Sequence, residues 1–359
     1  MSKIIIQIID EFSGGGAQRS TLKIAKGFAE KGHNVHLISI YDKEPEYPMD
    51  FKNKYYTLGY EKNKLFKNLF YSKKLKKLLL SIERKNGKIN LILGNLGLAH
   101  KLMALAKLND AYYTIRNTLS TSKLDVRDGI SKAIKRKKIY NFYKDKKLIS
   151  VSKGVRDDLY NEFSINPEIN IVIYNPFDFN EIRNLAQDNN IYANQKYIVH
   201  VGRFVDAKRH DILLKAYVKS KIQYKLILLG QGNNENHIRK LVSKLDIEDN
   251  VIFAGFHPNP YPIIKDAKML VLSSDFEGLP TVLIESLILN TPAVSTNCKS
   301  GANEILTNKL QKFLSPIGDY EALAINIKKM SKELLSTFDD ELKPFSIDTV
   351  INEYIKLCR

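Results

Sequence analysis

Short apolar runs alternate with longer amphipathic stretches along the whole chain. An apolar run at residues 3–9 leads through a glycine-rich turn into a helical pattern at 18–31, and a second apolar run follows at 34–40. Continuous apolar runs are typical of parallel strands buried on both faces, and a 3.6-residue period is typical of a helix. This order therefore predicts a βαβ unit. The same criteria predict further strands at 54–58, 89–94, 111–116, 147–152, 170–174, 197–201, 225–229, 251–255, 269–272, 292–296 and 312–314.

The alternation of strands and helices continues through 359 residues, which is enough for two domains of ordinary size. It predicts an α/β protein with two doubly wound, Rossmann-like domains. Each should bind ligands beyond the carboxyl ends of its strands, so that the two sheets face a cleft. We place the first domain at residues 1–182 and the second at 183–345, with the asparagine-rich stretch 186–195 as the linker.

Composition indicates a globular protein that stays in the cytoplasm. Hydrophobic residues make up 44% of the chain, and no apolar run reaches the length of about 18 residues that a membrane-spanning helix needs. The first apolar run is too short for a secretory signal and breaks directly into acidic residues. Cys298 and Cys358 are too few for a disulfide framework or a metal cluster, as expected in a reducing compartment.

The positive charge of the chain lies almost wholly in its first half. The formal net charge is +17, with 33 Lys and Arg against 18 Asp and Glu in residues 1–180, and 23 against 21 in the remainder. This asymmetry indicates an anionic partner for the first domain, and membrane lipid, nucleic acid and a polyanionic substrate are the candidates.

Two basic segments carry most of this charge. In 64–80 the apolar positions 65, 66, 69, 70, 75, 78 and 79 form one helical face and lysines occupy much of the rest. Such a helix fits a membrane surface or packs on its own sheet, and the pattern does not separate the two. In 132–147, Ile139, Tyr140, Phe142 and Tyr143 interleave with lysines, which favours an anionic membrane. Nucleic acid comes second, because no recognised nucleic-acid motif accompanies the segment.

Two carboxylates stand out in the segment 273–304. Glu277 follows a predicted strand within a glycine loop, and Glu285 lies more than one turn into a helix with Pro280 at its first position. A carboxylate pair suits the vicinal hydroxyls of a sugar, because each ionised carboxylate only accepts hydrogen bonds. Acidic residues near a helix start are also favoured by the helix dipole alone.

The run FEGLPTVLIES resembles the nucleotide-sugar signature of retaining GT-B glycosyltransferases of the bacterial family-four type, the glycosyl transferases group one. The resemblance implies that Glu277 contacts the donor sugar and Glu285 the nucleotide ribose. It extends into Pro292, Ala293, Gly301 and Glu304. Similarly, GRFVDAKRHD resembles the family segment in which an arginine and a lysine, here Arg203 and Lys208, hold the donor diphosphate. Gly255, Phe256 and His257 would then border the nucleotide base.

The first half matches this family more loosely. The loop GGGAQR resembles the family's glycine loop beside the donor phosphates and the acceptor, which implies roles for Gly15 and Gly16. Many relatives have a sugar-contacting histidine where this chain has Arg116, and we expect Arg116 to meet a diphosphate or an anionic acceptor. The fragments LISVSKGVRDDL and VIYNPFD also match. By the same resemblance, the helical segment 346–359 should cross back onto the first domain.

These observations predict a glycosyltransferase that moves a hexose or N-acetylhexosamine from a nucleoside diphosphate sugar, with UDP expected, to a membrane-bound glycan acceptor. The acceptor classes are a lipid-linked oligosaccharide, a lipopolysaccharide core and a glycolipid. The family implies retention of anomeric configuration, and no Asp-x-Asp triplet indicates a metal, so no cofactor is expected. The enzyme would sit peripherally on the cytoplasmic face of the inner membrane. A nucleotide-sugar epimerase and a non-catalytic basic protein binding lipid or nucleic acid are the alternatives.

The expected site residues follow from these matches. The catalytic set is Glu277, Arg203 and Lys208, and the substrate-binding set is Gly15, Gly16, Arg116, Phe256, Gly278, Leu279, Pro280, Thr281 and Glu285.

Overall fold

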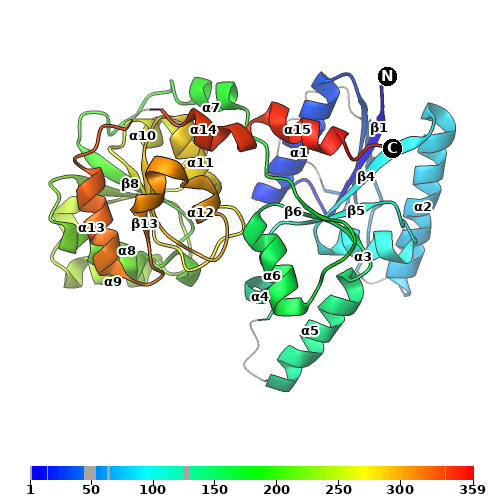
Figure 1. Cartoon of the computed structure of the whole chain (residues 1–359), viewed down its shortest axis with the longest axis horizontal. Helices are drawn as coiled ribbons and strands as arrows, with labels where there is room; N and C mark the ends of the chain where they lie inside the picture. Colours follow the sequence, from blue (N-terminus) through cyan, green and yellow to red (C-terminus); the bar gives the residue numbers. More distant parts are fainter. Residues whose placement is uncertain (1, 14, 44–53, 63–64, 125–128, 336) are drawn as a thin grey trace. The chain divides into compact units, whose positions relative to one another are not determined.

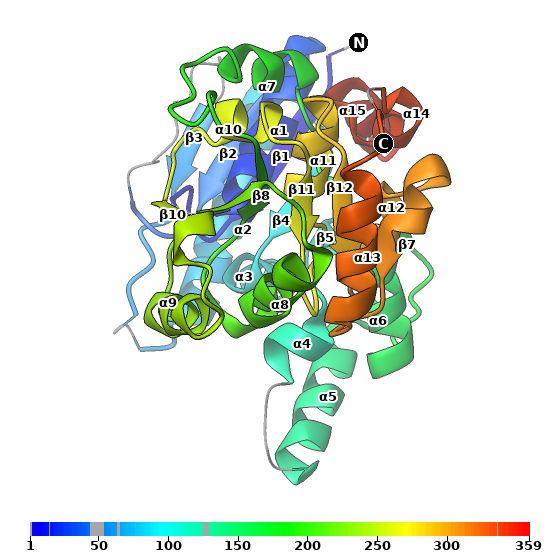
Figure 2. The same ribbon diagram turned by 90° about the vertical axis from the view of Figure 1, so that its left-hand side faces the viewer.

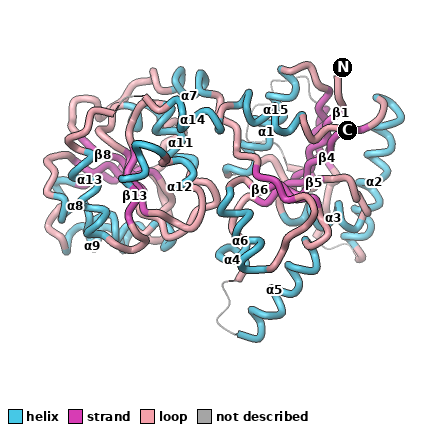
Figure 3. The backbone as a smooth tube through the Cα atoms, in the orientation of Figure 1, coloured by secondary structure: helices cyan, strands magenta, loops and turns pink. Residues whose placement is uncertain are grey.

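The computed structural model describes residues 2–13, 15–43, 54–62, 65–124, 129–335 and 337–359. The chain forms two compact units: Met1–Phe177 with Phe345–Arg359 is unit 1, and Asp178–Pro344 is unit 2. In each unit a parallel sheet lies between helices (Figures 1 and 3). The strands are central because their continuous apolar sequences can only be buried with helices on both faces.

The sheet of unit 1 has seven strands in the order β3-β2-β1-β4-β5-β6-β7, all parallel. The order reverses between β1 and β4, which is the switch point of a doubly wound sheet. The strands are β1 (Ile4–Ile9), β2 (Asn34–Ser39), β3 (Lys54–Thr57), β4 (Ile89–Asn95), β5 (Tyr112–Ile115), β6 (Lys147–Ser150) and β7 (Asn170–Val172).

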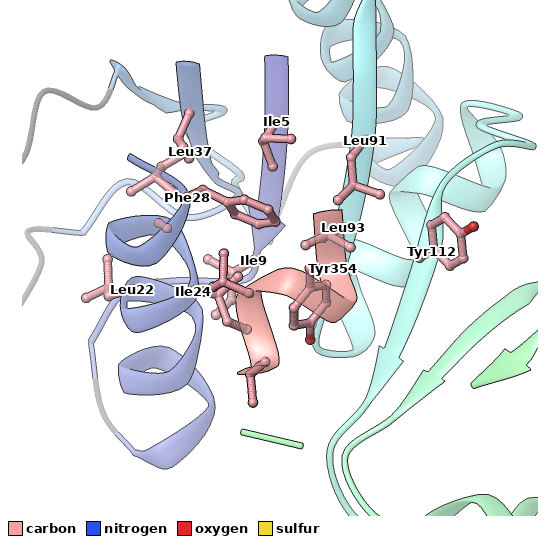
Figure 4. Packing of buried hydrophobic residues seen from close by; sticks show 14 of the residues in the cluster. Ile5, Ile9, Leu22, Ile24, Phe28, Leu37, Leu91, Leu93, Tyr112 and Tyr354 are labelled. Carbon is pink, nitrogen blue, oxygen red and sulfur yellow. The ribbon is translucent and has the colours of Figure 1, made fainter. Parts of the chain in front are cut away.

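Helices from both ends of the chain cover one face of this sheet. The helices of unit 1 are α1 (Gly16–Glu30), α2 (Lys67–Asn86), α3 (Gly97–Leu105), α4 (Leu119–Lys123), α5 (Gly129–Tyr143), α6 (Lys153–Phe163) and α15 (Ile347–Ile355). Phe28 of α1 and Tyr354 of α15 pack with Ile5 and Leu93 of the sheet (Figure 4). The two helices approach closely at Gly27, where a Cβ would lie 2.5 Å from Cγ1 of Ile351.

The sheet of unit 2 has six parallel strands in the order β10-β9-β8-β11-β12-β13, with its switch point between β8 and β11. The strands are β8 (Tyr197–Val201), β9 (Lys225–Leu229), β10 (Val251–Gly255), β11 (Leu270–Leu272), β12 (Ala293–Thr296) and β13 (Leu314–Ser315).

Helices α8, α9 and α13 lie on one side of the sheet of unit 2, and α7, α10 and α11 lie on the other (Figures 1 and 2). The helical segments are α7 (Phe179–Leu185), η1 (Asp206–Lys208), α8 (His210–Ser220), α9 (Glu235–Lys244), η2 (Glu248–Asn250), α10 (Tyr261–Lys265), α11 (Thr281–Ile288), α12 (Ala302–Ile305), η3 (Asn308–Phe313), α13 (Tyr320–Met330) and α14 (Asp339–Leu342), and η4 (Lys343–Phe345) leads back into unit 1.

Four expectations about local structure need correction. The stretch 186–195 is part of unit 2 rather than a linker, because Asn190 is buried and its amide donates to the Tyr197 hydroxyl at 2.9 Å and to Asp266 Oδ2 at 2.7 Å. Pro280 is the N-cap residue of α11 rather than its first helical residue. Lys312 and Phe313 end η3, so strand β13 begins only at Leu314. The boundary expected after residue 182 falls within α7, whereas unit 1 ends at Phe177.

The basic segment at 64–80 does not present one apolar face. Leu75 and Leu79 of α2 are buried together with Tyr71 and Ile82, so this face packs on unit 1. The positions before and within the first turn are instead exposed: Leu65 by 81%, Phe66 by 77%, Leu69 by 49% and Phe70 by 45%. Helix α2 therefore has a buried apolar face and a separate exposed apolar tip. Lys64 and residues 44–53 lie outside the described residues.

The aromatic residues of the second basic segment differ in their exposure to solvent. Tyr143 is buried in unit 1, where its hydroxyl is 3.0 Å from Nδ1 of His100, and the ring of Phe142 packs on it. Ile134 and Tyr140 of α5 remain exposed. Helix α5 extends away from the other elements of unit 1 in both views (Figures 1 and 2).

No helix among the described residues has the length and apolar content needed to span a bilayer.

Candidate active site

The site of unit 2 forms at its topological switch point. The loop after β8 carries Arg203 and Lys208, and the loop after β11 carries Glu277. Strands β8 and β11 are neighbours in the sheet and run parallel, so these loops leave the same edge side by side. This edge is where open α/β sheets bind their ligands.

Lys208 and Glu277 form an ion pair at this edge. The ammonium nitrogen of Lys208 lies 2.5 Å from Oε1 of Glu277, and the two side chains are only 20% and 15% exposed. The Ser274 hydroxyl donates to the same oxygen at 2.7 Å, and the Ser300 hydroxyl donates to the Glu277 carbonyl. The stem of Lys208 lies over Gly202, where a Cβ would be 3.3 Å from Cδ and Cε of the lysine. Both members of the pair are therefore held by their surroundings.

Arg203 is placed differently from Lys208. Its side chain is exposed and forms no hydrogen bond or ion pair with any residue that the structure describes. It follows Gly202 directly at the end of β8, so its guanidinium can reach an anion at the same edge without giving up an internal partner.

The loops after β8 and β9 approach each other so closely that they require glycine. A Cβ at Gly230 would lie 2.0 Å from the Gly202 carbonyl oxygen, and one at Gly232 would lie 2.4 Å from the Phe204 carbonyl oxygen. Phe256 follows β10 at the same edge of the sheet and exposes 60% of its surface. An exposed aromatic ring beside such a loop can stack on a planar base.

Gly301 packs closely against the segment from Gly278 to Glu285. Gly301 has φ of 88°, and a Cβ there would lie 2.5 Å from Cδ of Pro280 and 3.1 Å from Cα of Leu279. Leu279 and Pro280 are buried, while Thr281 begins α11 and Glu285 lies in its second turn, partly buried. The EGLP loop therefore packs at this place only because residue 301 has no side chain.

Two histidines lie near Lys208. His200 Nδ1 is 2.9 Å from the Val271 carbonyl oxygen, and its ring centroid is 4.8 Å from that of His210. Burial, with the nearby positive charge of Lys208, lowers the pKa of His210 to about 4. Burial, with His210 and Lys208 nearby, also lowers the pKa of His200 well below its usual value. Both rings are therefore neutral near pH 7. Burial and the charge of Glu277 raise the pKa of Cys298 to about 12, which keeps this neighbouring thiol protonated.

The glycine loop of unit 1 is open. Gly15 is the N-cap of α1 and Gly16 its first residue, and a Cβ at either would meet no atom within 4 Å. The space over this helix start can admit a ligand to the backbone. Gly14, part of the predicted loop, lies outside the described residues.

Arg116 does not offer its guanidinium to a ligand. Its nitrogens donate to side-chain oxygens of Asn95 (3.2 and 2.7 Å), Ser20 (3.0 Å), Asn175 (2.9 Å) and Thr21 (3.3 Å). These bonds use all five donors of an arginine side chain. The expected contact with a diphosphate or an anionic acceptor is therefore not supported, and Arg116 instead joins α1, β4 and the residues after β7.

Sequence reasoning missed the residues that hold Glu277 and Lys208 in place. Ser274 and Ser300 are small polar residues of ordinary loops, and their role depends on side-chain directions that no motif reports. The carboxylate at position 275 and the arginine at 209, described below, were missed for the same reason. Among the described residues no group of three or more His, Cys, Asp or Glu side chains could hold a metal ion.

The two sheets and their switch points define a pair of Rossmann-like domains of the GT-B kind. The family model described as glycosyltransferase family 4 matches residues 14–181, and the model described as glycosyl transferases group 1 matches residues 181–336. Together they account for nearly the whole chain, and the chain belongs to this family of glycosyltransferases.

Relatives and solved structures agree with this family. An N-acetylgalactosaminyltransferase of Campylobacter jejuni acting on a diphospho-undecaprenol is 33% identical over 182 residues, which are 51% of this chain and 50% of that protein. The chain thus spans about half the length of this relative. A second C. jejuni enzyme, an α-1,4-N-acetylgalactosaminyltransferase, is 26% identical over 98% of this chain and 96% of its own. An Anabaena protein solved with UDP and glucose has a TM-score of 0.72, 18% identity, and coverage of 99% and 98%.

Proposed function

We propose that this glycosyltransferase transfers a hexose or N-acetylhexosamine from a UDP-sugar to a lipid-linked or other glycan acceptor, with retention of configuration and without a metal ion. The Lys208–Glu277 ion pair, with Arg203 on the same loop as Lys208 at the switch point of unit 2, carries this proposal. Two cations and a carboxylate at one sheet edge match the charges of a sugar diphosphate, whose phosphates are anionic and whose sugar offers hydroxyls.

The ion pair suggests how donor binding proceeds. Negative charge grows on the leaving diphosphate as its bond to the anomeric carbon breaks, and the sugar becomes oxocarbenium-like. Lys208 and Arg203 stabilise this diphosphate charge. Lys208 must then exchange Glu277 for a phosphate oxygen, which releases the carboxylate to accept hydrogen bonds from the sugar. Glu285, one helical turn beyond Thr281, holds the ribose, and Glu277 orients the sugar without attacking it.

The choice of donor and acceptor rests on the relatives. The Anabaena structure contains UDP, and the two C. jejuni enzymes carry N-acetylgalactosaminyltransferase activity in their names. Both of their named acceptors are undecaprenol-linked glycans. A lipid-linked acceptor also agrees with the excess of positive charge in residues 1–180 of this chain.

We further propose that the enzyme works at an anionic membrane surface and that α2 makes the contact. Its exposed tip, formed by Leu65, Phe66, Leu69 and Phe70, lies next to Lys73, Lys76 and Lys77, which are all exposed. An apolar tip followed by lysines suits insertion among headgroups, where each nearby lysine contributes about 1 kcal/mol. Helix α5 offers less apolar surface, since Tyr143 is buried.

The donor is tested by thermal stability against UDP-, GDP-, ADP- and TDP-sugars, without metal and with EDTA. A ligand at 100 times its dissociation constant should stabilise the protein by about 2.7 kcal/mol. Stabilisation of the parent, but not of Glu285→Ala, by UDP-sugars alone supports the proposal. Stabilisation by none of the compounds, with the protein folded, refutes the assigned donor site.

Membrane contact is tested by cosedimentation with vesicles of phosphatidylglycerol and phosphatidylcholine. The double variant Phe66→Ser/Leu69→Ser should lose at least about tenfold in vesicle affinity, because it removes the apolar tip. Ile134→Ser/Tyr140→Ser on α5 is the matched control, since both residues are exposed beside lysines. Equal losses in both variants would contradict a specific role for α2.

A further inference from the structure

Arg209 joins the two loops that carry Lys208 and Glu277. Its Nε and Nη2 donate to the two carboxylate oxygens of Asp211, each at 2.9 Å, and its Nη1 lies 3.1 Å from both oxygens of Asp275. Asp211 lies in α8, on the same segment as Arg209. Asp275 lies on the loop after β11, two residues before Glu277. The guanidinium is therefore a bridge between segments that are far apart in the chain.

The backbone at Arg209 is strained to make this bridge. Its φ is +46°, a left-handed conformation that glycine adopts readily and other residues adopt at a cost. A residue chosen for the turn alone would be glycine or asparagine. Lys107 and Lys221 of the same chain adopt a similar φ, so the conformation is compatible with a long side chain, and the role of Arg209 rests on the contacts that its guanidinium makes.

Two further contacts tie the same loops together. The Asp275 amide donates to the Ala207 carbonyl at 2.9 Å, and the Ser273 hydroxyl donates to the Lys208 carbonyl at 2.8 Å. Apart from the Lys208–Glu277 pair itself, the Arg209–Asp275 bridge is the ion pair that joins these loops, and it lies on the residue next to Lys208. Since side chains of Arg209, Asp211 and Asp275 are each about one third exposed, the bridge is partly shielded from water.

The bridge also settles which carboxylate Lys208 pairs with. Asp275 and Glu277 are two residues apart, and an unpaired Asp275 would compete for the lysine and repel an incoming diphosphate. The bonds to Asp211 and Asp275 raise the pKa of Arg209, although burial opposes them. Burial alone would raise the pKa of Asp211, but the hydrogen bonds and charge of Arg209 outweigh it and lower the pKa. Arg209 and Asp211 are thus both charged near pH 7.

We propose that Arg209 is a positioning residue: through Asp275 it holds the Glu277 loop in register with Lys208, and it keeps that register when the donor separates the ion pair. This inference rests on the proposed function, because it assigns Arg209 a part in the same donor site. Arg209 itself does not touch the reacting atoms. Misplacement of a catalytic group by about 1 Å can reduce the rate about 100-fold.

The chain supplies matched variants for a test. Asp275→Asn breaks the 3.1 Å bridge between loops, whereas Asp211→Asn removes a 2.9 Å ion pair that lies within one segment. Release of UDP from UDP-glucose and UDP-N-acetylglucosamine is measured for Arg209→Ala, Arg209→Lys and both aspartate variants, with UDP affinity and thermal stability alongside. Release of UDP by the parent tests the proposed function, and the ratio of each variant to the parent tests the bridge.

We expect Arg209→Ala and Asp275→Asn each to lower kcat about 10- to 100-fold, with a smaller change in KM and no greater loss in the double variant. Asp211→Asn should stay within about threefold of the parent. Guanidinium at sub-denaturing concentration should restore part of the activity of Arg209→Ala, because both carboxylates remain to bind it. Guanidinium should not restore the activity of the double variant. It should also leave the activity of Arg239→Ala unchanged, since in the parent Arg239 forms an exposed ion pair with Glu235.

Two results would overturn the proposal while leaving the proposed function intact. One is an active parent whose kcat is unchanged in Arg209→Ala. The other is an equal loss in Asp211→Asn and Asp275→Asn, which would mean that the arginine only stabilises its own turn.

Discussion

The roles of Lys208 and Glu277 can be distinguished experimentally. Because the two side chains form an ion pair, we expect substitutions of Lys208 and of Glu277 to have opposite effects on nucleotide binding. Lys208→Met removes a cation that we assign to the donor diphosphate. A hydrogen bond to a charged group contributes about 1.5–3 kcal/mol, so UDP should bind about 10- to 100-fold more weakly. Glu277→Gln instead leaves Lys208 without its 2.5 Å carboxylate partner. Its ammonium is then free for phosphate, and UDP should bind as tightly as in the parent or more tightly.

Sugar transfer should respond differently from UDP binding. Both variants should lose about 100-fold or more in kcat/KM with a UDP-sugar. One lacks the cation that binds the diphosphate, and the other lacks the carboxylate that accepts hydrogen bonds from the donor sugar. Calorimetric titration with UDP and an assay of UDP release from the sugar nucleotide give the two quantities separately.

Each variant is the stability control for the other. Both lose the same ion pair, whose members are 20% and 15% exposed, so their Tm values should fall by similar amounts. If Glu277→Gln weakens UDP binding as much as Lys208→Met does, the pair is a structural element and the exchange of partners proposed above is wrong.

Three further predictions concern the surroundings of the sites. Burial lowers the pKa of His210 to about 4, below its usual 6.5, so the folded state resists protonation. As pH falls from about 6.5 to about 4, the unfolded state binds the proton first and this residue costs about 3 kcal/mol of stability; His210→Phe should flatten that part of a urea-unfolding series. Gly301→Ala should lower Tm and weaken UDP-sugar binding, since its Cβ would meet Pro280; unchanged values would contradict the role of Gly301 in holding the EGLP loop. Arg116→Lys should destabilise unit 1 by about 2–3 kcal/mol in urea, because an ammonium has three donors for the acceptors that five N–H groups now satisfy, whereas an equal stability would show those bonds to be dispensable.

The strands were readable from the sequence because burial on both faces makes them continuous apolar runs. Those of β8, β9 and β10 were placed at their observed bounds, 197–201, 225–229 and 251–255. Parallel order then fixes which loops share an edge, so Arg203, Lys208 and Glu277 could be expected together before their distances were known. Gly301 was matched by resemblance alone, and its packing on Pro280 supplies the reason.

Side-chain pairing between distant segments was not readable. Nothing local distinguishes Arg209 and Asp275, 66 residues apart, from the many other charged residues of the chain. Periodicity likewise gave α2 a single apolar face, because it counts spacing and cannot tell which turns lie beside the sheet. Arg116 was expected to face a ligand, but its neutral acceptors come from three separate segments that only the fold assembles.

The return of α15 to unit 1 has a consequence for how the protein is made. All residues of unit 2, 178–344, leave the ribosome before α15 does, and they form a compact unit with its own sheet and helices. Unit 1 cannot close its core until α15 reaches α1 at Gly27, with Tyr354 beside Phe28. Domains usually fold in the order of synthesis, the N-terminal one first. Here unit 1 is synthesised first but completed last. The apolar face that α15 covers stays uncovered while unit 2 is translated.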